Sequence, residues 1–230
     1  MAIRYFKFAD RPAAVVDFHH EVLIPWSCWR REFFSETPFE AVVFDHHTDV
    51  LSNPDFPGRP GEWQEAAAVE KAVENLRHDE QFCWALKSGL ASRIKIVSHL
   101  PSATVGAAGL SVRCPADYPD EFTQLNRPEI FRPYAENMLS DICLKELLPM
   151  LPSAPFILDF DCDAIFCGAA LRPRPDTVWR QLLKRAAGFT VALESDYVRL
   201  LKLPNEDALT AEAIATELLR QFAASAAPGN

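Results

Sequence analysis

The sequence predicts a single α/β domain in which three layers, α/β/α, are built around a mostly parallel β-sheet. Short continuous apolar runs recur along the chain, and such runs are typical of strands that are buried on both faces. Segments with apolar residues at helical spacing lie between or after these runs, as in successive βαβ units. The length of 230 residues fits one large domain or two small ones, and we expect residues 1–230 to form a single domain.

The five apolar runs are predicted as strands, and they cover Ala13–Val16, Ala41–Phe44, Ile94–Val97, Pro155–Leu158 and Phe189–Leu193. Four periodic segments are predicted as helices: Trp63–Arg77, Ile130–Leu148, Asp176–Ala187 and Ala208–Phe222. Thr210 is a candidate cap for the last helix, because a threonine hydroxyl accepts a hydrogen bond from a backbone N–H group. The proline-rich stretches Ser52–Pro60 and Leu171–Pro175 are predicted as loops.

The composition excludes several classes of protein. Hydrophobic residues make up 49% and charged residues 24%, which is too apolar for a disordered chain. The formal charge of 23 − 32 = −9 provides no bulk basic surface, so we expect no nucleic-acid partner. The sequence contains no run of about 18 apolar residues, so we expect no membrane span. No export signal is visible either, and we therefore expect a cytoplasmic protein. The six cysteines form no CxxC pair and are expected to be reduced thiols rather than zinc ligands.

Acidic and histidine side chains follow four of the five apolar runs. They are Asp17, His19, His20 and Glu21 after the first run, Asp45, His46, His47 and Asp49 after the second, Asp159, Asp161 and Asp163 after the fourth, and Glu194 after the fifth. The carboxyl ends of parallel strands meet at one edge of the sheet, where open α/β sheets bind their ligands. The sequence therefore predicts that these side chains converge on one crevice.

Such a convergence of carboxylates requires cations. Two carboxylates about 4 Å apart repel by roughly 4 kcal/mol at an effective dielectric of 20. In extended backbone, residues two apart point to the same side, so Asp45, His47 and Asp49 share a face while His46 and Thr48 turn away. The acids of 159–163 alternate in the same way. With a histidine from a third segment, these groups offer enough ligands for two metal ions, and oxygen-rich ligands with imidazole favour manganese or magnesium.

These residues resemble the ureohydrolase (arginase) superfamily, which carries Asp-x-His-x-Asp after one strand and Ser-x-Asp-x-Asp after a later one. The resemblance implies an arginase-like fold, a binuclear centre of two Mn²⁺ ions, and a final acid, Glu194, that holds the substrate guanidinium. The metal ligands that it implies are His19, Asp45, His47, Asp49, Asp161 and Asp163. Two alternatives stay open. His20 competes with His19, and the pair Asp159 and Asp161 competes with Asp161 and Asp163, because Asp159 stands where the family has serine.

A narrower resemblance, in islands between residues 13 and 200, is to the UPF0489 group. It rests on Val-Val-Asp-Phe-His-His-Glu-Val-Leu, Val-Val-Phe-Asp-His-His-Thr-Asp and Leu-Asp-Phe-Asp-Cys-Asp. Bacterial members include peptide arginases, so the resemblance implies an arginine-containing precursor peptide as partner and ornithine plus urea as products. Asp49 would then deliver a proton to the leaving amine, and His99, which follows the third run, is a candidate proton shuttle. The alternatives are an agmatinase-like enzyme or free-arginine arginase, and a metal-binding homologue without activity.

Overall fold

The computed structural model describes residues 3–34, 37–100, 107–115, 117–152 and 155–226. Within these residues, a seven-stranded sheet runs in the order β1-β2-β7-β6-β3-β4-β5. The strands are β1 (Arg4–Phe8), β2 (Arg11–Val16), β3 (Phe39–Asp45), β4 (Ala91–Ser98), β5 (Leu110–Arg113), β6 (Phe156–Asp161) and β7 (Ala186–Ala192). Every neighbouring pair is parallel except β1 with β2, which confirms the predicted mostly parallel sheet.

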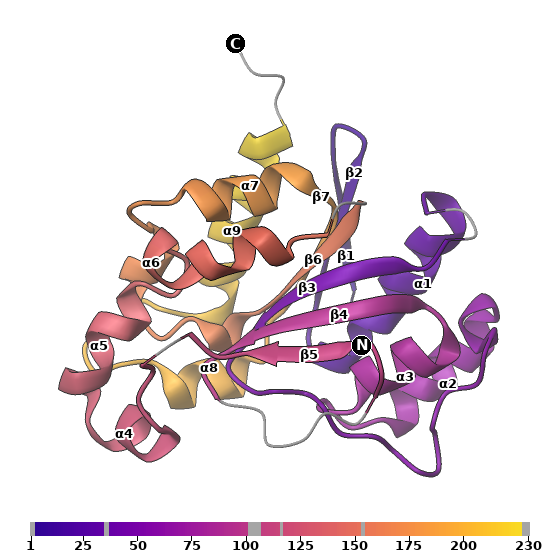
Figure 1. The fold of residues 1–230 in the computed structure, drawn as a ribbon, viewed down its shortest axis with the longest axis horizontal. Coiled ribbons are helices and arrows are strands. Elements are labelled where there is room, and N and C mark those ends of the chain that lie inside the picture. Colours follow the sequence, from indigo (N-terminus) through magenta and orange to yellow (C-terminus); the bar gives the residue numbers. More distant parts are fainter. Residues whose placement is uncertain (1–2, 35–36, 101–106, 116, 153–154, 227–230) are drawn as a thin grey trace.

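Helices cover both faces of the sheet, so the fold has the three predicted layers (Figure 1). One face packs against α1 (Leu23–Glu32), α2 (Ala66–Asn75) and α3 (Gln81–Ser88). The other face packs against α5 (Pro128–Glu136), α6 (Asp141–Leu144), α7 (Thr177–Arg185) and α9 (Ala211–Ala226). The alternation of side chains along each strand divides the core in two. Val43 on β3 faces the α1–α3 layer, for example, and its neighbour Phe44 faces the other layer.

Each of the five predicted strands is present, and each is longer than its apolar run or displaced by a residue. The strands that sequence reasoning missed are the two at the edges of the sheet, β1 and β5. Most residues of β1 are exposed, and β5 has only four residues. Edge strands keep one side toward solvent and therefore do not form the continuous apolar run that identifies a central strand.

The predicted helix over Ile130–Leu148 is wrong as one continuous helix. The structure divides it into α5, α6 and a short 3₁₀ helix at Lys145–Met150. The break lies at Asn137, which ends α5, and at Ser140, whose extended backbone (φ −82°, ψ 161°) precedes α6. Asparagine and serine favour helix ends because their side chains compete for backbone hydrogen bonds.

The other predicted helices are present with shifted ends. Trp63–Arg77 is a 3₁₀ turn followed by α2, because Glu65 between them is extended (φ −96°, ψ 113°). α7 ends at Arg185, one residue before β7 begins. Thr210 caps α9 as predicted, since its hydroxyl accepts a hydrogen bond of 3.2 Å from the Ala213 N–H group. Three α-helices among the described residues were not predicted: α3, α4 (Glu121–Asn126) and α8 (Ser195–Leu201).

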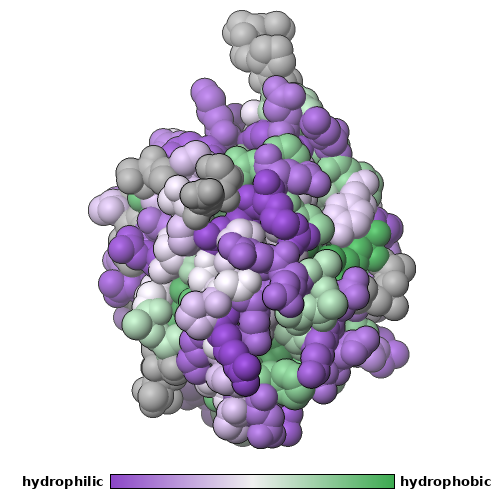
Figure 2. Space-filling model, turned by 90° about the vertical axis from the view of Figure 1, so that its right-hand side faces the viewer, coloured by the Kyte–Doolittle hydropathy of each residue, from purple (hydrophilic) through white to green (hydrophobic). Residues whose placement is uncertain are grey.

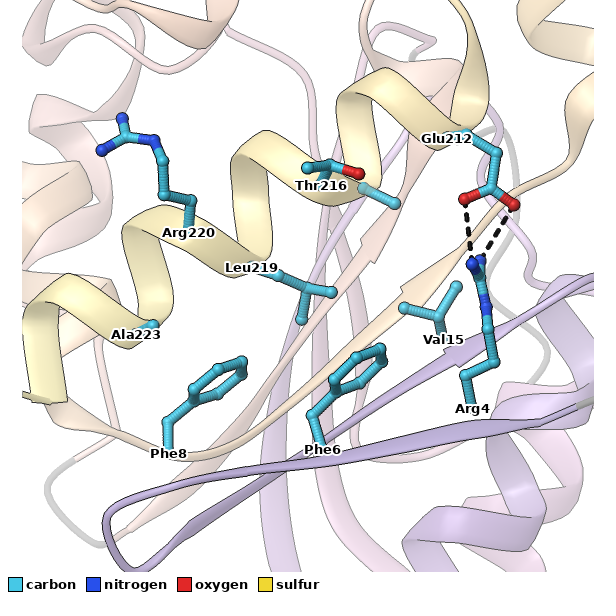
Figure 3. A pocket seen from close by; sticks show the side chains of 10 residues that line it. Arg4, Phe6, Phe8, Val15, Glu212, Thr216, Leu219, Arg220 and Ala223 are labelled. Atoms are coloured by element: carbon cyan, nitrogen blue, oxygen red, sulfur yellow. Dashed lines mark hydrogen bonds and ion pairs between the residues drawn. The ribbon is translucent and has the colours of Figure 1, made fainter.

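An apolar groove of about 330 Å³ lies between the antiparallel strand β1 and α9 (Figure 3). Phe6 and Phe8 on β1 face Leu219 on α9 across this groove. At one end of the groove, the Arg4 guanidinium donates two hydrogen bonds of 3.0 Å to the Glu212 carboxylate. These contacts attach the edge strand to the helix layer.

The surface of the molecule is mostly hydrophilic on the face seen in Figure 2. Figure 2 views the molecule from the right-hand side of Figure 1 and shows a largely hydrophilic face with small apolar patches. None of the helices in the described ranges is both long and apolar enough to cross a bilayer. The six cysteines form no disulfide bond in the structure.

Candidate metal centre

The side chains predicted to converge lie at the carboxyl edge of four neighbouring strands. β2, β7, β6 and β3 are adjacent in the sheet, so the segments that follow them meet on the α1–α3 side. His19 begins a 3₁₀ turn after β2, Asp45 ends β3, and Asp161 ends β6. All three side chains are buried. Parallel strand topology alone therefore brings together residues that are up to 142 positions apart.

The first ligand group surrounds one nitrogen of His19. His19 Nδ1 lies 3.0 Å from Asp49 Oδ2 and 3.2 Å from Asp161 Oδ2. Asp45 Oδ2 lies 3.4 Å from the same nitrogen. One ligand atom each from His19, Asp45 and Asp161 lies within 4.8 Å of the others, which suits one metal ion.

The second ligand group consists of Asp45, His47 and Asp163, again with ligand atoms within 4.8 Å of one another. His47 Nδ1 lies 3.0 Å from Asp163 Oδ2 and 3.8 Å from Asp45 Oδ1. Backbone groups orient both carboxylates, because Asp45 Oδ1 accepts from the His47 N–H group (2.7 Å) and Asp163 Oδ1 accepts from that of His46 (3.1 Å). Asp45 belongs to both groups, so two ions held here would share it.

The residues present fit a pair of divalent cations. Three atoms of the two groups, His19 Nδ1, Asp45 Oδ2 and Asp163 Oδ2, are buried and make no hydrogen bond of suitable geometry, although other ligand atoms of the cluster lie close to them. Burial and the charge of Asp49 raise the pKa of Asp45 well above its usual range, and burial and the charge of Asp163 do the same for Asp161. A cation would remove this penalty, since it stabilises the ionised carboxylates. Carboxylate oxygens with imidazole nitrogens form a donor set that manganese accepts.

The structure places the residues of the two open alternatives in different surroundings. His19 lies among the carboxylates, whereas the ring of His20 packs on Phe18 at 6.0 Å, and burial lowers the pKa of His20 to about 4. Asp159 also lies behind the ligand groups. Its Oδ1 accepts from the Thr190 hydroxyl and its Oδ2 lies 2.7 Å from His19 Nε2, so both oxygens have partners away from the ligand atoms.

The stretch after β3 alternates as expected only at its start. His46 turns away from the ligand groups and packs on Phe166 at a ring distance of 5.1 Å. Asp49, however, has left-handed backbone (φ 42°), and Thr48 lines the same cavity as His47 and Asp49. The regular alternation therefore does not extend through Asp49, because the backbone at Asp49 is no longer extended.

Gln81 supports Asp49 and was missed by sequence reasoning. The Gln81 side chain is fully buried at the start of α3, and its amide donates to Asp49 Oδ2. The two residues are 32 positions apart, and no spacing rule links them. Only the packing of α3 against the strand end brings the amide to the carboxylate.

Glu194 stands at the rim of the centre. It is buried at the start of α8 with left-handed backbone (φ 39°), and its Oε1 accepts a hydrogen bond of 2.9 Å from the His19 N–H group. Burial raises the pKa of the Glu194 carboxyl, although the hydrogen bond and charge of His19 oppose this. A carboxylate in this position can accept hydrogen bonds from a cationic ligand.

His99 lies away from solvent, in an aromatic pocket behind His46. Its ring is fully buried among Phe166 (5.0 Å), Tyr118 (5.4 Å) and His46 (5.5 Å). Burial lowers the pKa of His99 to about 3, so the ring is neutral at physiological pH. A ring that is buried in this way does not suit the expected shuttle of protons from solvent. The aromatic groups that pack on His99 come from other elements, so its position in the sequence did not reveal them.

A cavity of about 380 Å³ opens over the second ligand group. Its walls include His47 and Asp49 from the centre, and His78, Asp79 and Tyr197 from outside it. The Tyr197 ring packs on His47 at 5.2 Å, and its hydroxyl lies 3.3 Å from His78 Nε2. None of the described residues that line this cavity is lysine or arginine.

The metal-free protein should lose stability between pH 6.5 and pH 8. Burial lowers the pKa of His47, but Asp163 outweighs it and raises the pKa to about 9, against 6.5 in the unfolded chain. The contribution of His47 to stability is therefore complete below pH 6.5 and is lost as the pH rises toward 9. The lowered pKa values of His20, His46 and His99 affect stability only below pH 6.5.

The His47 side chain is 40% exposed, so solvent screening reduces the expected loss to about 1 kcal/mol, or about 2–4 °C in Tm. Thermal unfolding of chelator-treated protein across this pH range measures it. The His47→Gln variant is the control, and its Tm should vary less with pH. A wild-type Tm that stays constant or rises between pH 6.5 and pH 8 would contradict the proposed contribution of His47 to stability.

The chain was compared with family models, curated proteins and solved structures. No family model matches the chain, and no curated protein matches its sequence. Among solved structures, an arginase from Medicago truncatula aligns with a TM-score of 0.46 and 18% identity over 94% of this chain. The aligned part is 60% of that arginase, so the chain spans less than two thirds of its length.

Proposed function

We propose that the chain is a manganese-dependent hydrolase that converts arginine side chains of a precursor peptide to ornithine and releases urea. The observation that carries this proposal is the pair of ligand groups that share Asp45 at the carboxyl edge of the sheet. Three ligand atoms of these groups are buried without a hydrogen bond, and bound cations would satisfy them. The motifs around these residues also resemble those of the ureohydrolase superfamily.

The six residues His19, Asp45, His47, Asp49, Asp161 and Asp163 would hold two Mn²⁺ ions. Such a pair, when bound, would activate a water molecule at neutral pH and stabilise the negative charge that develops in the reaction. Glu194 would bind the guanidinium of the substrate. Its carboxylate stands beside the centre, and hydrogen bonds between charged groups are stronger than those between neutral ones.

Asp49 is the residue to which we assign proton transfer. Its Oδ2 accepts from Gln81, and its Oδ1 would take a proton from the attacking water. The water oxygen forms a bond to the guanidinium carbon, and the bond from that carbon to Nε breaks with its electron pair on Nε. Nε takes up the two protons of the water, one of them through Asp49, so that an ornithine ammonium and neutral urea result.

The cavity favours a substrate without a carboxylate near its guanidinium. Free arginine carries an α-carboxylate, and the described residues of the cavity wall include no lysine or arginine to pair with it. They instead include Asp79, whose buried Oδ1 is without a partner, and an unpaired anion beside it would be costly. An arginine inside a peptide has no free carboxylate, and the exposed Leu51 at the cavity wall leaves room for a flanking chain.

Urea release from an arginine-containing peptide, from free arginine and from agmatine tests the proposal, each with and without added Mn²⁺. We expect Mn²⁺-dependent urea from the peptide and a mass loss of one carbodiimide unit on the product. Faster turnover of agmatine would favour an agmatinase-like enzyme. Binding of Mn²⁺ without urea from any of the three substrates would indicate a metal-binding protein without this activity.

A further inference from the structure

A buried chain of hydrogen bonds runs from α1 through the sheet to His19. Trp26 Nε1 donates to Thr190 Oγ1 at 3.1 Å, and the Thr190 hydroxyl donates to Asp159 Oδ1. Asp159 Oδ2 lies 2.7 Å from His19 Nε2. All four side chains are buried, at 1% exposure or less. Asp159 and Thr190 stand directly opposite each other on β6 and β7, so the register of the sheet fixes their contact.

The chemistry of these groups sets the direction of every hydrogen bond. The Trp26 indole can only donate, so the Thr190 oxygen accepts from it and its single proton goes to Asp159. The Asp159 carboxylate then accepts from both sides, which requires a proton on His19 Nε2. The other ring nitrogen, Nδ1, faces the three carboxylates of Asp45, Asp49 and Asp161.

We propose that Asp159 is a positioning residue rather than a metal ligand. Together with Thr190 and Trp26, it holds His19 with its proton on Nε2 and presents the lone pair of Nδ1 to an ion bound by Asp45 and Asp161. This inference rests on the metal centre of the proposed function. Partners of this kind, which bind the outer nitrogen of a ligating histidine, typically change metal affinity by about 10- to 100-fold when they are removed.

The test compares Thr190→Val with Thr190→Ser in equilibrium dialysis against Mn²⁺. Valine keeps the shape of threonine but leaves Asp159 Oδ1 and the Trp26 N–H group without a partner, whereas serine keeps the hydroxyl. We expect the valine variant to bind one of the two ions about 10- to 100-fold more weakly and the other ion normally. The serine variant should bind both ions like the wild type. If Thr190 and Asp159 contributed only to stability, Thr190→Val would lower Tm without selectively weakening the binding of one ion.

Histidine side-chain ¹⁵N–¹H NMR of the wild-type protein loaded with Zn²⁺ provides a second test, because it shows which ring nitrogen of His19 carries the proton. We expect His19 to show a proton on Nε2 and coordination through Nδ1. A proton on Nδ1, or equal Mn²⁺ binding by the valine and serine variants, would overturn the proposal for Asp159 alone. A wild-type chain that takes up no Mn²⁺ would overturn the proposed function as well.

Discussion

Replacing Asp45 by asparagine should remove both metal ions and reduce Mn²⁺-dependent urea release at least about 1,000-fold, which corresponds to about 4 kcal/mol of activation free energy. Asp45 is the residue that both ligand groups share, and its side chain is fully buried. Asparagine keeps the shape of the side chain, and its oxygen can still accept the hydrogen bond from the His47 N–H group. The variant therefore removes the charge and leaves the local backbone in place.

The same variant should stabilise the metal-free protein. Burial and the neighbouring charges of Asp49 and Asp163 raise the pKa of Asp45, which means that its ionised form is unfavourable in the fold. A neutral side chain avoids this penalty, and we expect the Tm of the metal-free variant to rise by about 2–4 °C for each 1 kcal/mol gained. Added Mn²⁺ should raise the Tm of the wild type only. Elemental analysis and thermal unfolding measure the two effects.

Asp17→Asn provides the matched control, because Asp17 lies at the same edge of the sheet but belongs to neither ligand group. It should retain both ions and near wild-type urea release. If Asp45→Asn bound two ions, or if both variants lost activity equally, the shared role of Asp45 would have to be abandoned.

The residues that the sequence could predict are those whose position follows from strand topology. Asp45 and Asp161 directly end buried strands, so a parallel sheet brings them together whatever the loops do. Two open choices needed the structure. His19 and His20 are adjacent, and only the turn after β2 determines which ring enters the cluster. Asp159 carries the same chemistry as Asp161, and its contacts with Thr190 and His19 Nε2 distinguish its surroundings from those of Asp161.

Supporting residues could not be predicted, because their partners lie far away in the sequence. Gln81 comes to Asp49 through the packing of α3, and Tyr197 comes to His47 through the packing of α8, neither of which was predicted as a helix. His99 does follow the carboxyl end of β4, but Phe131 and Phe166 come from other elements and enclose its ring. Its position along the chain could not show this burial, and its role in proton transfer stays a prediction.

Glu194→Gln should reduce kcat/KM for an arginine-containing substrate by about 10- to 100-fold while both metal ions stay bound. A hydrogen bond to a charged group contributes about 1.5–3 kcal/mol, and glutamine offers the guanidinium a neutral oxygen instead of a carboxylate. Because Glu194 accepts from the His19 N–H group through one oxygen, glutamine can keep that contact and the backbone that positions His19. The loss should therefore appear in urea release and not in manganese content.

Asp196→Asn on α8 is the control for this loss, because its side chain is 90% exposed and pairs with Arg199 at the surface. The comparison separates recognition of the guanidinium from a general effect of acidic charge, since both variants remove one negative charge from the same helix. Equal kinetics for the two variants would show that Glu194 only orients the turn that carries His19. A decrease in bound manganese for Glu194→Gln alone would instead assign this residue to the metal centre, because its carboxylate would then act through the His19 backbone rather than on the substrate.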